Sequence, residues 1–159
     1  MRPLEPQEEK LQQYMRQNGI EAEHLIFNSS CHTAAEAAES AGATLEDLVK
    51  NVCFVTEAGR FVVVIVKGED RVDAKRVAAL TGSKKPKHAP AEAVLAHTGY
   101  AVGGVPSFGY EAQILIDERV LERPWILTGG GSDRSLVKVA VPELIRASGG
   151  QVETVRKTE

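Results

Sequence analysis

Apolar residues recur at helical spacing near the start of the chain. Leu11, Tyr14 and Met15 fall on one side of a predicted helix over Leu4–Asn18, and Gly19 is a typical helix end. Later helices are predicted from capping residues at their starts and from glycines at their ends. They run from Thr33 to near Gly42, from Thr44 to Asp47 and on into Val49-Lys50, from Asp73 to Leu80, from Pro90 (at the first helical position) to His97, and from Pro142 to Ser148.

Short runs of β-branched and aromatic residues predict strands between these helices. Asn51–Thr56 and Phe61–Lys67 are two such runs, and Glu57–Arg60 between them is typical of a hairpin turn. Helices and strands are mixed throughout, without an internal repeat or a Pro/Ser-rich linker. We therefore expect a single α/β (α+β) domain over residues 1–159, with a mostly antiparallel or mixed sheet. The other predicted strands are His24–Phe27, Gln113–Ile116, Trp125–Leu127, Leu136–Val141 and Val152–Val155.

The composition fits an ordinary globular protein. The chain has 159 residues, of which 43% are hydrophobic and 26% charged, and it is long enough to bury a core. These values exclude collagen-like, coiled-coil and disordered chains. The longest apolar run, Phe61–Val66, is far too short to span a membrane, and the N-terminus has no apolar signal segment. Two cysteines, Cys31 and Cys53, do not make a disulfide scaffold, so we expect a cytoplasmic protein with reduced thiols.

Charge is distributed unevenly along the chain. The formal net charge of −3, taken as a total, argues against a nucleic-acid partner. Residues 48–90, however, carry 9 basic and 4 acidic side chains, whereas residues 1–47 carry 3 basic and 9 acidic ones. A basic middle segment can bind a phosphate-bearing partner locally, and it can equally be a solvated surface. Both interpretations stay open on charge alone.

Two glycine-rich segments are the clearest candidates for a binding site. Residues 99–109 read GYAVGGVPSFG, and residues 128–135 read TGGGSDRS. Glycines let the backbone approach a ligand and turn its amides toward a phosphate or an oxyanion. The first segment lacks the spacing of a dinucleotide-binding fingerprint and of a nucleophile elbow. A tight turn between strands is the alternative for each segment alone, but two such loops in one small domain favour a shared binding cleft.

Few single residues have obvious chemical potential. Lys50 is expected at a helix end, where it either complements the helix dipole or binds a phosphate, with Asn51 beside it as an amide partner. Cys31-His32 has the residue types of a thiol nucleophile and its base, but such pairs need closeness in space rather than in sequence. Cys53 lies in an apolar strand and is predicted to be a core residue. None of the four histidines has metal-ligand spacing, so no metal is expected.

Together these segments resemble the YbaK family, the editing domains related to the insertion domain of bacterial prolyl-tRNA synthetase. The resemblance covers roughly residues 20–155, and its most specific stretch is Thr98–Pro106, TGYAVGGVP. Further support comes from Lys50–Phe54 after an Ala/Glu-rich helix, from Phe61–Val66 and from Gly68–Lys75. The second glycine segment adds to it.

The resemblance implies a mixed, barrel-like β-sheet flanked by helices. It also implies a trans-acting aminoacyl-tRNA deacylase, which hydrolyses the ester between a wrong amino acid and the 3′ end of tRNA. In the family, the lysine that matches Lys50 contacts the acceptor end, and the loop that matches Gly103–Ser107 holds the terminal adenosine and the aminoacyl group. Many relatives have a proline where this chain has Ser107, and Pro106 lies one position earlier. The candidate catalytic residues are Lys50, Gly103, Gly104, Val105, Pro106 and Ser107.

The family uses no metal, and no cofactor is expected. An activated ester needs little activation of its nucleophile, which explains why no catalytic triad is visible. Water oriented by backbone groups and by a ribose hydroxyl of the substrate would suffice, and each loop amide on the oxyanion would contribute about 3 kcal/mol. The expected partners are the 3′ acceptor end of an aminoacyl-tRNA and, as a second candidate, an aminoacyl-tRNA synthetase, but no membrane and no DNA.

The basic stretch is a candidate for binding acceptor-stem phosphates. Two other functions stay open on the sequence. A non-catalytic module of the same fold would hold a nucleotide or aminoacyl-tRNA without turnover, and a thiol enzyme would use Cys31 as its nucleophile. The candidate substrate- and tRNA-binding residues are Ser30, His32, Thr33, Asn51, Gly109, Gly129, Gly130, Gly131, Ser132, Lys75, Arg76, Lys84, Lys85 and Lys87.

Overall fold

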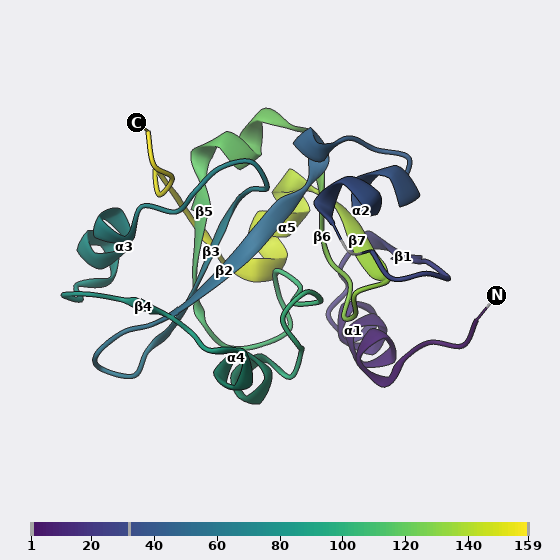
Figure 1. Ribbon diagram of the computed structural model, residues 1–159, viewed down its shortest axis with the longest axis horizontal. Coiled ribbons are helices and arrows are strands. Elements are labelled where there is room, and N and C mark those ends of the chain that lie inside the picture. Colours follow the sequence, from purple (N-terminus) through teal and green to yellow (C-terminus); the bar gives the residue numbers. More distant parts are fainter. Residues whose placement is uncertain (1, 32, 159) are drawn as a thin grey trace.

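Two β-sheets and five α-helices make up the described part of the chain, residues 2–31 and 33–158, in a computed structural model (Figure 1). The helices are α1 (Pro6–Gln17), α2 (Ala34–Ser40), α3 (Ala74–Thr81), α4 (Ala91–Thr98) and α5 (Val141–Ser148), with 3₁₀ turns η1 (Leu45–Asp47) and η2 (Glu118–Glu122). The strands are β1 (Ala22–Ile26), β2 (Val49–Val55), β3 (Phe61–Lys67), β4 (Lys87–His88), β5 (Gln113–Asp117), β6 (Trp125–Gly129), β7 (Ser135–Ala140) and β8 (Gln151–Glu153).

The larger sheet has five strands in the order β4-β2-β3-β5-β8. Strands β2 and β3 form the predicted antiparallel hairpin, with Val49 opposite Lys67, whereas β5 runs parallel to β3 and β8 parallel to β5. The smaller sheet, β1-β7-β6, is antiparallel throughout. A parallel bridge between Leu48 and Leu127 joins the two sheets at the start of β2. The predicted α+β class with a mixed, barrel-like sheet flanked by helices is confirmed.

Strand β3 lies at the centre of the core because both of its faces are buried. Its side chains alternate between the two faces, as in any strand. Val63 and Ile65 pack into the larger apolar cluster, which also contains residues of α1 and α5. Val62 and Val64 pack on the other face, in a cluster that α3 covers. A strand covered on both faces needs apolar residues at successive positions, which explains the continuous run Phe61–Val66.

Helix limits follow the capping signals in the sequence. The Thr33 hydroxyl accepts the Glu36 amide at the start of α2, and the Asp73 carboxylate caps α3. The glycines after α3, α4 and α5 adopt the left-handed conformation that ends a helix. Pro90 is the N-cap of α4 rather than its first helical residue, since the helix begins at Ala91. The longest helix, α1, has 12 residues, and no helix of the described residues is long and apolar enough to cross a membrane.

Two segments differ from their predicted structures because pairing in the larger sheet overrides a local preference. The sequence predicts Val49-Lys50 as the end of a helix, but both residues open β2 and pair with β3. Lys87-His88, predicted as part of a basic loop, forms the short strand β4 against the other end of β2. The helix-dipole role considered for Lys50 is therefore wrong, because the preceding helical turn ends at Asp47.

Candidate functional site

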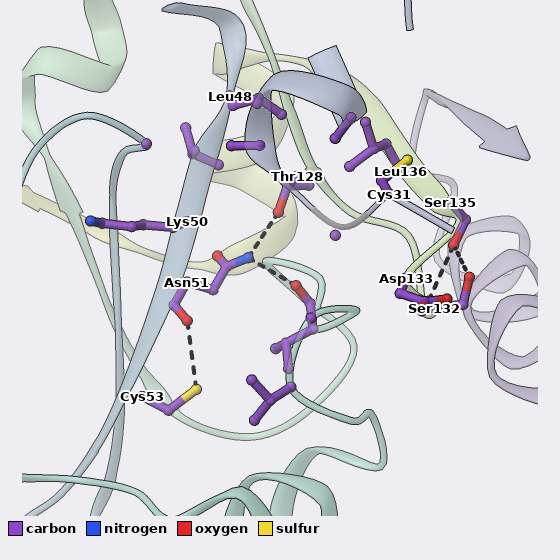
Figure 2. A pocket seen from close by; sticks show the side chains of 18 of the residues that line it. Cys31, Leu48, Lys50, Asn51, Cys53, Thr128, Ser132, Asp133, Ser135 and Leu136 are labelled. Atoms are coloured by element: carbon purple, nitrogen blue, oxygen red, sulfur yellow. Dashed lines mark hydrogen bonds between the residues drawn. The ribbon is translucent and has the colours of Figure 1, made fainter. Parts of the chain in front are cut away.

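A cavity of about 500 Å³ opens beside β2. Its walls come from α2, from β2, from the first glycine segment and from the turn between β6 and β7 (Figure 2). In this view Lys50 and Asn51 lie on one side, and Ser132, Asp133 and Ser135 lie on the other. The structure thus brings both glycine segments to one cavity.

Much of the cavity wall between these polar groups is apolar. Leu48, Leu136 and Cys31 line the cavity, as do Ala34 and Ala37 of α2, and Leu48 and Leu136 belong to one apolar cluster. An apolar wall with a few polar groups is typical of a site that orients a small organic ligand.

Lys50 is the single lysine or arginine that lines the cavity in the part of the chain that the structure describes. Its backbone pairs with Val66 in the centre of the larger sheet, which fixes the position from which the side chain starts. The side chain is exposed, and it makes no ion pair with any described residue. An ammonium group without a partner is available to an anionic group of a ligand.

Asn51, Ser107 and Thr128 form an inner polar cluster at the cavity wall, which Asn51 and Thr128 line. The Asn51 Nδ2 group donates to the Val105 carbonyl oxygen and to Thr128 Oγ1, at 2.9 Å each. The Ser107 hydroxyl donates to Asn51 Oδ1 at 2.7 Å and lies 2.8 Å from the Thr128 hydroxyl. Both hydroxyl residues are fully buried. These bonds join β2, the first glycine segment and β6, so the cluster holds the shape of the wall.

The two glycine segments touch through their backbones. The Gly131 amide donates to the Gly104 carbonyl oxygen at 2.8 Å. A Cβ atom on Gly104 would lie 2.6 Å from the Ser132 nitrogen, and one on Gly129 would collide with the Val105 carbonyl oxygen. No side chain fits between the segments, which explains why glycine occupies both positions.

Two backbone amides on the cavity wall remain open. Gly103 and Val105 line the cavity, and within residues 2–31 and 33–158 their N–H groups donate no backbone hydrogen bond. Gly103 is exposed and has φ +98°, a conformation that favours glycine. Free N–H groups beside a cavity can stabilise negative charge that develops on a bound group.

The structure divides the residues predicted for the site into three groups. Seven of them line the cavity: Thr33, Lys50, Asn51, Gly103, Val105, Gly129 and Ser132. Seven others, most of them in the two glycine segments, do not line it: Ser30, Gly104, Pro106, Ser107, Gly109, Gly130 and Gly131. The third group, in or near α3 and β4, also stays out of the cavity wall: Lys75, Arg76, Lys84, Lys85 and Lys87. His32 lies outside the described residues.

Some lining residues are not predicted from the sequence. Cys53, predicted as a core residue, is half-buried and lines the cavity, and burial raises the pKa of its thiol to about 11. Its thiol is therefore protonated near neutral pH and a weak nucleophile. Cys31 also lines the cavity, and both cysteines are free. No group of three or more His, Cys, Asp or Glu side chains among the described residues could hold a metal ion.

The fold and the cavity define an α+β domain that can hold a ligand with an anionic group. Residues 28–147, most of the chain, match the family model described as the aminoacyl-tRNA editing domain. The chain belongs to the aminoacyl-tRNA editing domain family. Membership in this family implies an aminoacyl-tRNA substrate.

Solved structures share this fold over nearly the whole chain. One, described as a candidate trans-editing enzyme for prolyl tRNA synthetase, has a TM-score of 0.91 at 30% identity, with 98% of this chain and 99% of that chain covered. The hypothetical protein APE2540 has a TM-score of 0.85 at 29% identity, covering 93% of this chain and 99% of that one.

A sequence relative, the uncharacterized protein YwhH of Bacillus subtilis (strain 168), is 27% identical over 142 residues, 88% of this chain and 87% of that protein. The family resemblance predicted from the sequence is confirmed.

Proposed function

We propose that the protein is a trans-acting aminoacyl-tRNA deacylase that hydrolyses the ester of a mischarged tRNA. One observation carries the proposal. Lys50, whose ammonium has no ion-pair partner among the described residues, lines the same cavity of about 500 Å³ as Gly103 and Val105, whose amides donate no backbone hydrogen bond within residues 2–31 and 33–158. The aminoacylated end of tRNA carries a phosphate, which can bind the Lys50 ammonium, and an ester carbonyl, which can accept hydrogen bonds from the two amides.

In this proposal, binding uses the charged and the apolar parts of the cavity. Lys50 binds a phosphate of the acceptor end through a charge-assisted hydrogen bond. The aminoacyl side chain lies against the apolar wall, where Leu48 and Leu136 contribute. Asn51 does not contact the substrate; it holds the wall through the inner polar cluster.

The reaction consumes one water. The water oxygen attacks the ester carbonyl carbon, and the carbonyl oxygen becomes an oxyanion that the Gly103 and Val105 amides stabilise. The bond between the carbonyl carbon and the ribose oxygen then breaks, and the proton that the water loses ends on that ribose oxygen. A neighbouring ribose hydroxyl of the substrate orients the water. The products are the free amino acid and uncharged tRNA.

A panel of mischarged tRNAs tests this function directly. Each is incubated with the wild-type protein, with Lys50→Ala or with buffer, and the loss of the ester is followed. We expect at least one mischarged tRNA to lose its ester faster with the wild type than in buffer, and we expect Lys50→Ala to slow this loss. The deacylase proposal fails if no charged tRNA is hydrolysed faster than in buffer.

The same panel separates the two alternatives. Tight tRNA binding without ester loss would select the non-catalytic binding module of the same fold. A thiol enzyme would lose activity in Cys31→Ala, whereas the water mechanism expects this variant to keep it. In the water mechanism, Cys31 serves only as part of the apolar cavity wall.

Five basic residues form a basic surface: Lys75, Arg76, Lys84, Lys85 and Lys87. They belong to α3, to β4 and to the loop between them, on one side of the molecule (Figure 1). We propose that this surface attracts the acceptor stem over a distance, because it does not border the cavity. We also propose that the chain acts in the cytoplasm as a single domain, with an aminoacyl-tRNA synthetase as a second partner.

A further inference from the structure

Helix α1 reaches the second glycine segment through one buried carboxylate. Glu8, in the first turn of α1, is fully buried. Its Oε2 atom accepts a hydrogen bond from the Ser132 hydroxyl at 2.5 Å, and Ser132 lines the cavity. The segment that matches the family model begins only at residue 28, so Glu8 lies outside it. A residue outside the matched segment therefore contacts the wall of the site.

Arg2 holds the Glu8 carboxylate in a fixed orientation. Its two terminal nitrogens donate to the two carboxylate oxygens, at 2.8 and 2.7 Å, which is a bidentate pair. The same guanidinium donates to the Phe27 carbonyl at 2.6 Å and to the Arg134 carbonyl at 3.1 Å. Burial alone would raise the pKa of Glu8, but the hydrogen bonds from Arg2 and Ser132 lower it to about 2. The carboxylate thus stays charged at neutral pH.

Backbone packing continues the contact toward the first glycine segment. Gly131 has φ +104°, and a Cβ atom there would lie 2.9 Å from the Gln7 carbonyl oxygen, so the turn rests directly on α1. The Gly131 amide donates to the Gly104 carbonyl oxygen. Gly104 stands between Gly103 and Val105, the two cavity-lining residues with open amides. A continuous set of contacts therefore joins the start of α1 to those amides.

We propose that Glu8 is a positioning residue of the cavity. Held by Arg2, it fixes the turn between β6 and β7, and through that turn it fixes the first glycine segment. It does not line the cavity and does not touch the substrate. The proposal rests on the deacylase function proposed above, because the fixed amides matter to catalysis only if they face an ester carbonyl.

Glu8→Gln tests the proposal because it keeps the size of the side chain and removes its charge. We expect kcat for ester hydrolysis to fall roughly 10- to 100-fold, as a small displacement of catalytic groups does. We expect KM for the charged tRNA to change less than about threefold, because Lys50 is untouched. Partial unfolding at the assay temperature would lower the folded fraction, which circular dichroism at that temperature measures, whereas a positioning effect lowers kcat with the folded fraction unchanged.

Glu143→Gln is the matched control. Arg146 also holds the Glu143 carboxylate in a bidentate pair, through its Nε and one terminal nitrogen at 2.6 and 2.7 Å, but this pair lies on α5 and does not line the cavity. We expect it to keep the wild-type kcat. Ser132→Ala is the second variant, used if Glu8→Gln does not fold, because it removes only the hydroxyl between the turn and Glu8. We expect a loss of kcat in the same direction, roughly fivefold.

The amide NMR shifts of Gly103 and Gly104 in the tRNA-free protein give a readout that needs no activity. We expect Glu8→Gln to move both signals and Glu143→Gln to move neither. A wild-type protein without deacylase activity would contradict the proposed function, while the shifts would still test the positioning contact. The proposal is overturned if both glycine signals stay in place in Glu8→Gln, or if its kcat equals that of the control.

Discussion

Lys50 and Asn51 are neighbours on β2 and border the same cavity, yet their contacts are opposite. The Lys50 ammonium has no ion-pair partner among the described residues, whereas the Asn51 amide bonds to three other residues. We call polar groups without such partners open: Lys50 and the amides of Gly103 and Val105. We call groups that are hydrogen-bonded within the protein closed: the inner polar cluster and the Glu8–Ser132 contact. Residue type does not distinguish them, but hydrogen-bond partners do. We infer that open groups bind and react, and that closed groups keep the wall in shape.

The largest expected effect comes from Gly129, where the two glycine segments touch. A Cβ atom there would collide with the Val105 carbonyl oxygen and lie 2.6 Å from its carbon, so the backbone has to move. We expect Gly129→Ala to lower the free energy of unfolding by about 4 kcal/mol and to abolish ester hydrolysis. Thermal unfolding and the deacylation rate measure the two effects.

Gly59→Ala is the control for this variant. Gly59 has φ +82° in the β2–β3 turn, and nothing lies within 4 Å of the position of its Cβ. In Gly59→Ala we expect the free energy of unfolding to fall by about 1 kcal/mol, the general cost of a side chain at positive φ, and we expect activity to stay intact. Equal losses in the two variants would show that contact between the segments is unimportant.

A smaller effect is expected in the pH dependence of stability. The pKa of Glu8 is about 2 in the folded protein against an ordinary 4.5, so folding favours the charged form. Its contribution is present above pH 4.5 and is lost as the pH falls toward 2; it is on the order of 3 kcal/mol at neutral pH. Glu8→Gln should therefore be less stable at neutral pH and lose less stability on acidification. Parallel curves for both proteins in denaturant titrations would contradict this.

Ser107→Ala tests whether the inner polar cluster is closed. It leaves Asn51 Oδ1 without its donor, which should cost about 1–2 kcal/mol of unfolding free energy and change the deacylation rate by less than about tenfold. Thr81→Val removes another buried hydroxyl, which donates to Val77 in α3, and should leave the rate unchanged. A stable Ser107→Ala protein without activity would instead make Ser107 an open, reacting group.

The smallest effect is expected from the basic surface. Replacing Lys84, Lys85 and Lys87 together by alanine should raise KM for charged tRNA about fivefold at low salt, roughly 1 kcal/mol, and leave kcat unchanged. The dependence of KM on salt should become weaker. Lys157→Ala, an exposed lysine outside this surface, is the control. An unchanged salt dependence in the triple variant would remove the basic surface from tRNA binding.

Much of the fold could be predicted because its signals are local. Helix caps such as Asp73, the glycines that end helices and the β2–β3 hairpin act over a few residues. The predicted structure is wrong for two segments, Val49-Lys50 and Lys87-His88. Both form strands by pairing with residues distant in the sequence. The turn η2 (Glu118–Glu122) was not predicted, although Asp117 caps it.

The candidate site could be predicted only in part. The two glycine segments and Lys50 were identified from composition and from the family resemblance, and the structure brings them to one cavity. Their division into open and closed groups depends on contacts between distant residues. Ser107 bonds to a residue 56 positions away, and Glu8 to one 124 positions away, so no local pattern marks either contact.

We infer that the open groups carry the reaction, and Lys50 is the charged group among them. The measurement is kcat/KM for ester loss from a mischarged tRNA with the wild type, Lys50→Ala and Lys157→Ala. We predict a loss of roughly 10- to 100-fold for Lys50→Ala, the value of one charged hydrogen bond, and no loss for Lys157→Ala. Both variants should keep wild-type stability, because both side chains are exposed. A Lys50→Ala protein with the wild-type kcat/KM would contradict the claim.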